Sequence, residues 1–378
     1  HLAAEIRLMA QQADVLIING GLGPTVDDLT AAALAQVIDQ PLEEHPEAMA
    51  HLQNWCGRLK YDINDANRKQ AILPAGVDIL ANPVGSAVGF SAEWSNCTIF
   101  CTPGVPRELF TMMDQQVIPA LAILGGGAPA ISTQRYRLFG IGESSLQQLI
   151  SDHYSDWPEA IELGFRASMP LLELKLTTRK AEDHSARETC LDRLAQLIGD
   201  NIVGPNEITL AERVLELLKQ QDLTITTAES CTGGLIASQI TQIAGASAGF
   251  EAGFVTYSNA IKSSIIGVNP DTLSAFGAVS EAVAREMALG ALAKSGADIA
   301  IAVTGIAGPD GGSPDKPTGT VWLAWGSAKN LQTQEFYIPG ERKFFQMMTA
   351  AIALDLVRRQ LQGITTTPRY FRDKAPIR

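Results

Sequence analysis

The feature that most constrains the fold is a local pattern that occurs twice along the chain. A short apolar run leads directly into a glycine-rich loop and then into a helix-like stretch. Residues 15–18 (VLII) precede the loop NGGLGPTVDDLT, and residues 223–227 (LTITT) precede the loop TAESCTGG. A buried strand, a glycine turn and a helix in that order are typical of an α/β layer with a parallel sheet. We therefore predict an α/β fold whose richest loops come directly after strand ends.

Length and charge limit what the chain can be. At 378 residues it is too long for one ordinary core, and we expect two or three domains. It carries 29 basic and 41 acidic side chains, which argues against nucleic acid or a membrane surface as a partner. No apolar run approaches the length of a membrane span, and no signal peptide opens the sequence. The five scattered cysteines give no disulfide framework, which favours a cytoplasmic location.

Changes in pattern along the sequence predict three domains and a tail. The first change is the glycine-rich linker GGGAP at residues 125–129. The second is a capping-box spacing from Thr209 to Glu212, which marks the start of a helix and of a new domain. The predicted segments are an α/β domain (1–128), a small α+β module (129–206), a second α/β domain (207–364) and a tail (365–378).

Two glycine-rich loops of the last domain are suited to an anion. TAESCTGG follows one predicted strand, and TGIAGPDGGSPDKPTG follows another at residues 299–303. Glycines allow backbone N–H groups to approach a phosphate closely, and a helix after Gly234 adds its positive end. The alternative is that the glycines only make tight turns. Two such loops on one sheet favour a phosphorylated small molecule as the ligand.

The side chains available for catalysis are few, because every histidine lies at or before position 184. A nucleophilic Cys231 has no His or Cys partner in the sequence, and a buried inert thiol is the alternative. Cys97 and Cys101 are four residues apart, but nothing completes a metal site, so two small buried residues is the better interpretation.

Ser230 and Ser247 are the other candidate nucleophiles, and an unprotonated lysine is the remaining strong base for them. Lys294 is expected to cap a helix end. Lys316 contacts either a phosphate or nothing. Lys262 follows a predicted buried strand, where burial would lower its pKa, or else it is an ordinary surface lysine.

Several of these motifs together resemble a known family. TAESCTGG, GFVTYSNAIK, GAVSE and TGIAGPDGGSPDKPTGTVW stand in the order found in the C-terminal domain of the CinA family, a bacterial nicotinamide-nucleotide amidase. NGGLGPTVDD, NPVGSAVGF and TPGVPRE resemble the N-terminal domain of that family, which has a molybdopterin-binding fold. The module between them resembles a small KH-like domain. The resemblance covers nearly the whole chain.

The resemblance implies an activity and a set of site residues. The reaction is the hydrolysis of nicotinamide mononucleotide (NMN) to nicotinate mononucleotide and ammonia, with Ser247 as nucleophile and Lys262 as base. Oxyanion donors are then expected near residues 246–248, and no cofactor is required. The implied substrate-binding residues are Glu229, Ser230, Thr232, Gly233, Gly234, Tyr257, Thr304, Gly305, Gly308 and Arg342. A homodimer is expected as well.

For the N-terminal domain the resemblance implies an ADP-ribose pyrophosphatase that depends on a divalent metal, with K⁺ as a further candidate ion. Asp28 is the implied catalytic or ligand carboxylate, with Glu108 assisting it. Family members carry an initial strand and helix that are missing before His1, so we expect this activity to be impaired. The rival hypothesis for the whole protein is a nucleotide-binding regulator of competence or of the DNA-damage response, without catalysis.

Overall fold

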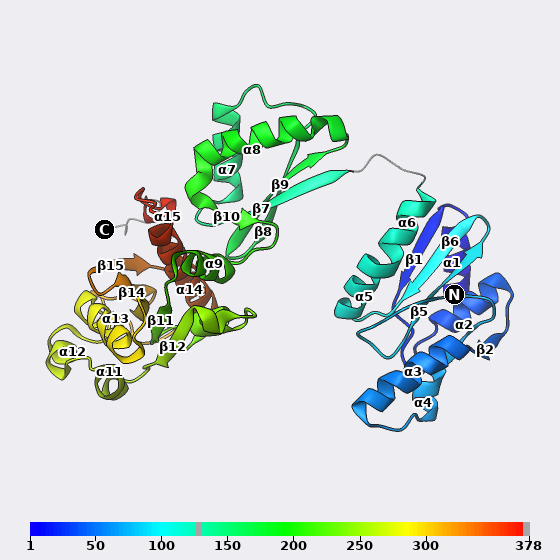
Figure 1. Cartoon of the computed structure of the whole chain (residues 1–378), viewed down its shortest axis with the longest axis horizontal. Helices are drawn as coiled ribbons and strands as arrows, with labels where there is room; N and C mark the ends of the chain where they lie inside the picture. Colours follow the sequence, from blue (N-terminus) through cyan, green and yellow to red (C-terminus); the bar gives the residue numbers. More distant parts are fainter. Residues whose placement is uncertain (126–130, 373–378) are drawn as a thin grey trace. The chain divides into compact units, whose positions relative to one another are not determined.

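The computed structural model describes residues 1–125 and 131–372, and their helices and strands form the mixed α/β fold that was predicted. The chain divides into two compact units, His1–Ala128 and Pro129–Arg378 (Figure 1). Apart from Gly125, the predicted linker at residues 125–129 lies outside the described residues. Among the described residues, no helix has the length and apolarity that a membrane span requires.

The first unit is built on a four-stranded sheet of order β1-β6-β5-β4, in which β1 and β6 are parallel. Its strands are β1 (Val15–Asn19), β4 (Asp78–Leu80), β5 (Gly89–Trp94) and β6 (Cys97–Thr102), with a separate pair β2 (Leu42–Glu44) and β3 (Ile72–Pro74). Its main helices are α1 (Leu2–Ala10), α2 (Thr30–Ile38), α3 (Pro46–Leu59), α5 (Pro106–Met112) and α6 (Ile118–Leu124). Every residue of β6 is buried, which explains its nearly continuous apolar sequence.

The second unit begins with an α+β module whose sheet is antiparallel, of order β10-β7-β9-β8. Its elements are β7 (Ser132–Leu138), α7 (Glu143–His153), β8 (Glu162–Ser168), β9 (Leu171–Thr178), α8 (His184–Ile198) and β10 (Ile202–Pro205). Apolar residues of α7, α8 and the strands β7 and β9 form one buried cluster, against which partly buried residues of β8 and β10 pack. Both helices therefore pack on the same core as the sheet.

The larger part of the second unit is a five-stranded sheet of order β12-β11-β13-β14-β15. Its strands are β11 (Ile225–Glu229), β12 (Phe250–Val255), β13 (Ile299–Gly305), β14 (Thr320–Ser327) and β15 (Asn330–Tyr337). Its helices are α9 (Leu210–Gln221), α10 (Leu235–Thr241), α11 (Asn259–Ile266), α12 (Pro270–Phe276), α13 (Glu281–Ser295) and α14 (Arg342–Leu361). The strand β11 is parallel to both neighbours, β12 and β13, and is buried along its whole length.

Helices cover both faces of this sheet. Residues of α13 pack with Ala228 and Ala300 in one cluster, while α9, α10 and α14 pack with Ile225 and Ile301 in another. The predicted capping box is present: Glu212 N–H donates to Thr209 Oγ1, and Thr209 N–H donates to the Glu212 carboxylate. The predicted strand at 223–227 is displaced by two residues, to Ile225–Glu229.

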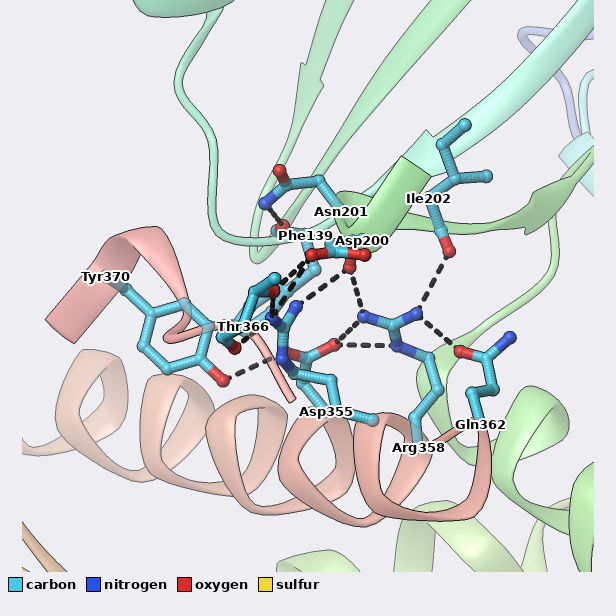
Figure 2. A network of polar contacts seen from close by, with 10 residues as sticks. Phe139, Asp200, Asn201, Ile202, Asp355, Arg358, Gln362, Thr366 and Tyr370 are labelled. Atoms are coloured by element: carbon cyan, nitrogen blue, oxygen red, sulfur yellow. Dashed lines mark hydrogen bonds and ion pairs between the residues drawn. The ribbon is translucent and has the colours of Figure 1, made fainter. Parts of the chain in front are cut away.

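The α+β module and the large sheet are joined through α14. The buried Arg358 guanidinium donates to the backbone carbonyls of Asp200 and Ile202 and pairs with Asp355 at 2.7 Å (Figure 2). In the predicted tail, a short helix α15 (Arg369–Arg372) brings Tyr370, whose hydroxyl donates to Asp355. These contacts explain why the module and the last domain form one compact unit.

Candidate active site

The most unusual side chain of the second unit is Lys262, which is only 1% exposed. It lies in the first turns of α11, after the carboxyl end of β12. Its Nζ is 3.0 Å from Ser230 Oγ, 2.9 Å from the Thr256 carbonyl and 3.2 Å from the Tyr257 carbonyl. Lys262 is therefore a buried lysine, and the alternative expectation of an ordinary surface lysine is wrong.

This environment favours the neutral amine. Burial lowers the pKa of Lys262 below its ordinary value, because the charged form is desolvated. Among the residues that the structure describes, Lys262 forms no ion pair with an acidic side chain. A neutral amine has two N–H donors and one lone pair. In the structure Nζ donates to the Thr256 and Tyr257 carbonyls and to Ser230 Oγ. If the amine lost one proton, two donors would remain for the carbonyls and the lone pair could accept from the Ser230 hydroxyl.

Ser230 is held at the carboxyl end of β11, between the two neighbouring strands. Its N–H donates to the Val303 carbonyl of β13, and the preceding Glu229 carbonyl accepts from Thr256 after β12. The peptide group between Glu229 and Ser230 is thus hydrogen-bonded on both sides, through its carbonyl and through its N–H. The carboxyl ends of parallel strands are where open α/β sheets bind ligands.

Ser247 does not meet Lys262 within the chain, which corrects the predicted catalytic pair. It is exposed, on the short 3₁₀ turn Ala246–Ala248 that precedes β12. The nearby Gly249 carbonyl accepts from Ile225, the first residue of β11, so Ser247 lies at the amino end of the strands. Lys262 follows their carboxyl end. Strands of this length rise about 15 Å, so the oxyanion donors expected near residues 246–248 are also at the wrong end.

Glu229 has a different role from the one expected. Its carboxylate accepts from the N–H groups of Gly234, Ile236 and Ala237, at 2.8–3.1 Å. These are the donors at the beginning of α10 that were expected to bind a phosphate. The carboxylate neutralises that helix end. Neither Glu229 nor the helix terminus is therefore available to an anionic ligand.

Cys231 is inert near neutral pH. It is 4% exposed, and burial raises the pKa of its thiol to about 12. The thiolate is the reactive form of cysteine, so this position offers no nucleophile under ordinary conditions.

Other predicted binding residues gather around the ends of the same strands. The Arg342 guanidinium, at the start of α14, donates to Tyr257 Oη at 2.8 Å and to the Gly308 carbonyl at 3.0 Å. Tyr257 and Arg342 are exposed, whereas Thr304 is buried and donates to the Ala278 carbonyl. Gly305 is the last residue of β13, and Gly308 lies on the loop that follows it.

Two further lysines have structural roles. Lys316 donates to the Phe276 and Val279 carbonyls at 2.8 Å, which ties the long loop after β13 to the end of α12. Lys294 lies in the last turn of α13, as its sequence position indicated.

A cavity of about 840 Å³ between β15, α14 and residues 364–370 is lined by none of the site residues named above.

In the first unit, Asp28 and Glu108 also follow parallel strands. Burial alone would raise the pKa of Asp28, but hydrogen bonds from the Thr25 side chain and from the Thr25 and Gly23 N–H groups outweigh it and lower that pKa. The Glu108 carboxylate accepts from Asn82 at 2.8 Å.

These carboxylates do not fit a metal centre. Over residues 1–125 and 131–372, no group of three or more His, Cys, Asp or Glu side chains is placed to hold a metal ion. Cys97 and Cys101 are both buried in β6 and belong to no such group.

Comparisons with known proteins cover nearly the whole chain. The sequence profile described as "CinA C-terminal domain" matches residues 207–361, and the profile "Probable molybdopterin binding domain" matches residues 1–123. A "CinA-like protein" of Colwellia psychrerythraea is 50% identical over 99% of this chain and 87% of its own length. A second, from Geotalea daltonii, is 39% identical over 94% of this chain and 86% of its own length.

Two solved structures match part of the chain. A "competence/damage inducible protein CihA" from Agrobacterium tumefaciens is 45% identical, with a TM-score of 0.39, and covers 40% of this chain and 93% of its own. A "Competence-Damaged Protein (CinA) Superfamily Protein" from Klebsiella pneumoniae is 38% identical, with a TM-score of 0.40, and covers 41% of this chain and 96% of its own.

Proposed function

The chain belongs to the CinA family, and on that premise we propose that it hydrolyses the carboxamide of NMN to nicotinate mononucleotide and ammonia. We assign the nucleophile to Ser230 and the base to Lys262. The observation that carries the assignment is the 3.0 Å contact between Lys262 Nζ and Ser230 Oγ, in a site where the lysine is buried and has no carboxylate partner among the described residues.

The reaction follows from that pair. Neutral Lys262 takes the hydroxyl proton while Ser230 Oγ bonds to the carboxamide carbon, and the carbonyl electrons move to oxygen. Collapse of this intermediate breaks the carbon–nitrogen bond, and the Lys262 ammonium returns the proton so that ammonia leaves. Water then attacks the acyl-enzyme and gives its proton to Lys262. The second collapse breaks the ester bond and releases nicotinate mononucleotide, and the Lys262 ammonium returns its proton to Ser230 Oγ.

NMN is proposed as the substrate because the motifs resemble those of the CinA family. The residues around Ser230 and Lys262 are compatible with this nucleotide. The exposed Tyr257 ring offers a surface for the pyridine, and Arg342 offers a guanidinium without a carboxylate partner among the described residues for the phosphate. Thr232, Gly233, Gly234, Thr304, Gly305 and Gly308 remain the proposed lining. No metal takes part in this scheme, so chelator should leave ammonia release unchanged.

The test is ammonia release from NMN by purified protein and by two matched serine variants. Ser230→Ala should lower kcat by several orders of magnitude, because it removes the covalent step. Ser247→Ala is the control, an equal change on an exposed turn at the opposite end of the sheet, and should keep near-parental turnover. Loss of activity in Ser247→Ala alone would transfer the nucleophile to that position.

The regulatory hypothesis predicts another outcome of the same assay. A protein that only binds nucleotides would release no ammonia and would still show saturable NMN binding by calorimetry. That result would reject the amidohydrolase. For the first unit we propose no more than a weak ADP-ribose pyrophosphatase activity, since its carboxylates form no metal centre of their own.

A further inference from the structure

An acyl transfer at Ser230 needs hydrogen-bond donors for the oxyanion, and the loop after Ser230 has donors that are not used. Within the part of the chain that the structure describes, Thr232 N–H donates to no acceptor, and Cys231 N–H donates to none outside its own residue. Thr232 Oγ1 is buried and also has no partner there, in a residue that is only 3% exposed. Buried polar groups without partners are rare and call for an explanation.

These donors are distinct from the helix terminus that follows them. The N–H groups of Gly234, Ile236 and Ala237 are already taken by the Glu229 carboxylate. The free donors therefore belong to the two peptide units directly after Ser230. In serine hydrolases of α/β type, the N–H of the residue after the nucleophile is one of the oxyanion donors, and Cys231 stands at that place here.

The direction of both N–H groups is fixed by what their peptide carbonyls accept. In a trans peptide the N–H points opposite to the C=O. The Ser230 carbonyl accepts from Gly233 N–H at 3.1 Å, which sets the direction of Cys231 N–H. The Cys231 carbonyl accepts from Gln346 Nε2 of α14 at 2.8 Å, which sets the direction of Thr232 N–H.

We infer that the N–H groups of Cys231 and Thr232, with the Thr232 hydroxyl, form the oxyanion hole, and that Gln346 is the positioning residue that orients it. This inference rests on the proposed function, because it takes Ser230 as the nucleophile. Gln346 acts from α14, more than a hundred residues further along the chain, and does not itself touch the substrate.

The experiment compares variants that remove one group and keep its volume. Thr232→Val removes the hydroxyl, and Thr232→Ser restores it. Gln346→Met removes the donor to Cys231. The matched controls are Thr227→Val, which loses another buried hydroxyl without a partner among the described residues, and Gln360→Met, which loses an amide of the same helix that reaches Asn330 instead.

Thr232→Val and Gln346→Met should each lower kcat for NMN by about 10- to 100-fold, because oxyanion donors act on the transition state. KM should change by less than about threefold. The part of the pH profile that rises toward alkaline pH should stay in place, because Lys262 is unchanged. Thr232→Ser should recover most of the loss, and both controls should behave as the parent. A merely structural role of Gln346 would shift KM or the pH profile together with kcat.

A second measurement does not depend on the substrate. A fluorophosphonate phosphonylates an activated serine with loss of fluoride, and the rate of labelling at Ser230 can be followed by mass spectrometry. The same two variants should label more slowly than their controls. If the parent hydrolyses NMN while the variants equal their controls in both measurements, this inference is wrong and the proposed function stands. If the parent labels at Ser230 but releases no ammonia, NMN hydrolysis is wrong, and the labelling rates of the variants alone decide this inference. If the parent does neither, both are wrong.

Discussion

In the first unit, Asp28 follows β1, and Glu108 lies in the first turn of the helix after β6, so both carboxylates are at the carboxyl end of a parallel strand pair. In the second unit, Ser230 follows β11 and Lys262 lies in the helix after β12, at the same end of another parallel pair. The two units therefore place their polar loops by one topological rule.

The difference lies in what surrounds the ionisable group. Asp28 is half-buried, and N–H and hydroxyl donors stabilise its charged form, so its pKa is lowered. Lys262 is buried against neutral oxygens, which lowers its pKa by destabilising the charged form. The first environment stabilises a charge, and the second destabilises one. Only the second shifts its group toward the uncharged form, which is the form that can take a proton from a hydroxyl.

The largest effect is expected at this point of difference. Lys262→Ala should reduce ammonia release from NMN by at least about 10³-fold, because Ser230 loses its base. Lys262→Arg should not rescue it, since a guanidinium keeps its proton. Asp28→Asn, the corresponding change in the first unit, should leave kcat unchanged. Equal losses from Asp28→Asn and Lys262→Ala would mean that the two units form one site.

A second difference between the units concerns stability, because only the second is tied together by the ion pair in Figure 2. Arg358→Met leaves Asp355 buried without its charge partner, and we expect it to lower the free energy of unfolding of this unit by about 3–5 kcal/mol. Urea titration followed by far-UV circular dichroism should show the loss in one transition, while the transition of the first unit stays in place.

The control for that experiment is Arg213→Met, which breaks a partly exposed pair with Glu216 on α9 and should cost less than about 1 kcal/mol.

The contacts of Arg358 and Arg359 also bear on the predicted domain boundary at residue 206. A fragment of residues 207–378 lacks the Asp200 and Ile202 carbonyls that Arg358 and Arg359 bind, so it should unfold at lower urea than a fragment of residues 129–378. Equal stability would contradict the structural role of the network.

The sequence predicts much of this comparison, for reasons that are local. The buried strands, the glycine loops and the Thr209 capping box each depend on neighbouring residues. The edge strand β15 was not predicted, because its alternating exposed residues resemble a polar loop. The family resemblance implies that Glu229 contacts the ligand. Its partners in the structure lie five to eight residues ahead, across a tight turn that the sequence does not reveal.

The choice between the two serines shows where the family resemblance and the fold point to different residues. Ser230 comes directly after a parallel strand, and Ser247 comes shortly before one. Parallel strands bring all their carboxyl ends together, so that distinction alone separates the two residues by the length of the sheet. The order of strands and serines along the chain therefore favours Ser230, whereas the family resemblance implies Ser247.

A smaller effect is expected on pH dependence, and its sign follows from the lowered pKa of Lys262. Activity should rise toward alkaline pH as the amine loses its proton. The folded chain binds this proton more weakly than the unfolded chain does. Between the lowered pKa and the ordinary value near 10.5, the unfolded state thus holds more protons, and the free energy of unfolding rises with pH. The Lys262→Met variant should lack this increment in urea titrations across the same pH range, and an identical pH slope in both proteins would show that Lys262 titrates normally.

The smallest effect is expected from Cys231→Ser. The thiol is buried with a pKa raised to about 12, so it is neutral throughout the working range and supplies no nucleophile. Serine keeps the backbone N–H and the carbonyl that Gln346 holds, and it changes only one buried atom. We expect kcat for NMN to stay within about threefold of the parent, with a small loss of stability from burying a hydroxyl. If Cys231→Ser were instead as inactive as Ser230→Ala, the contrast between a desolvated amine and an inert thiol would fail, and the loop after β11 would have to use its sulfur.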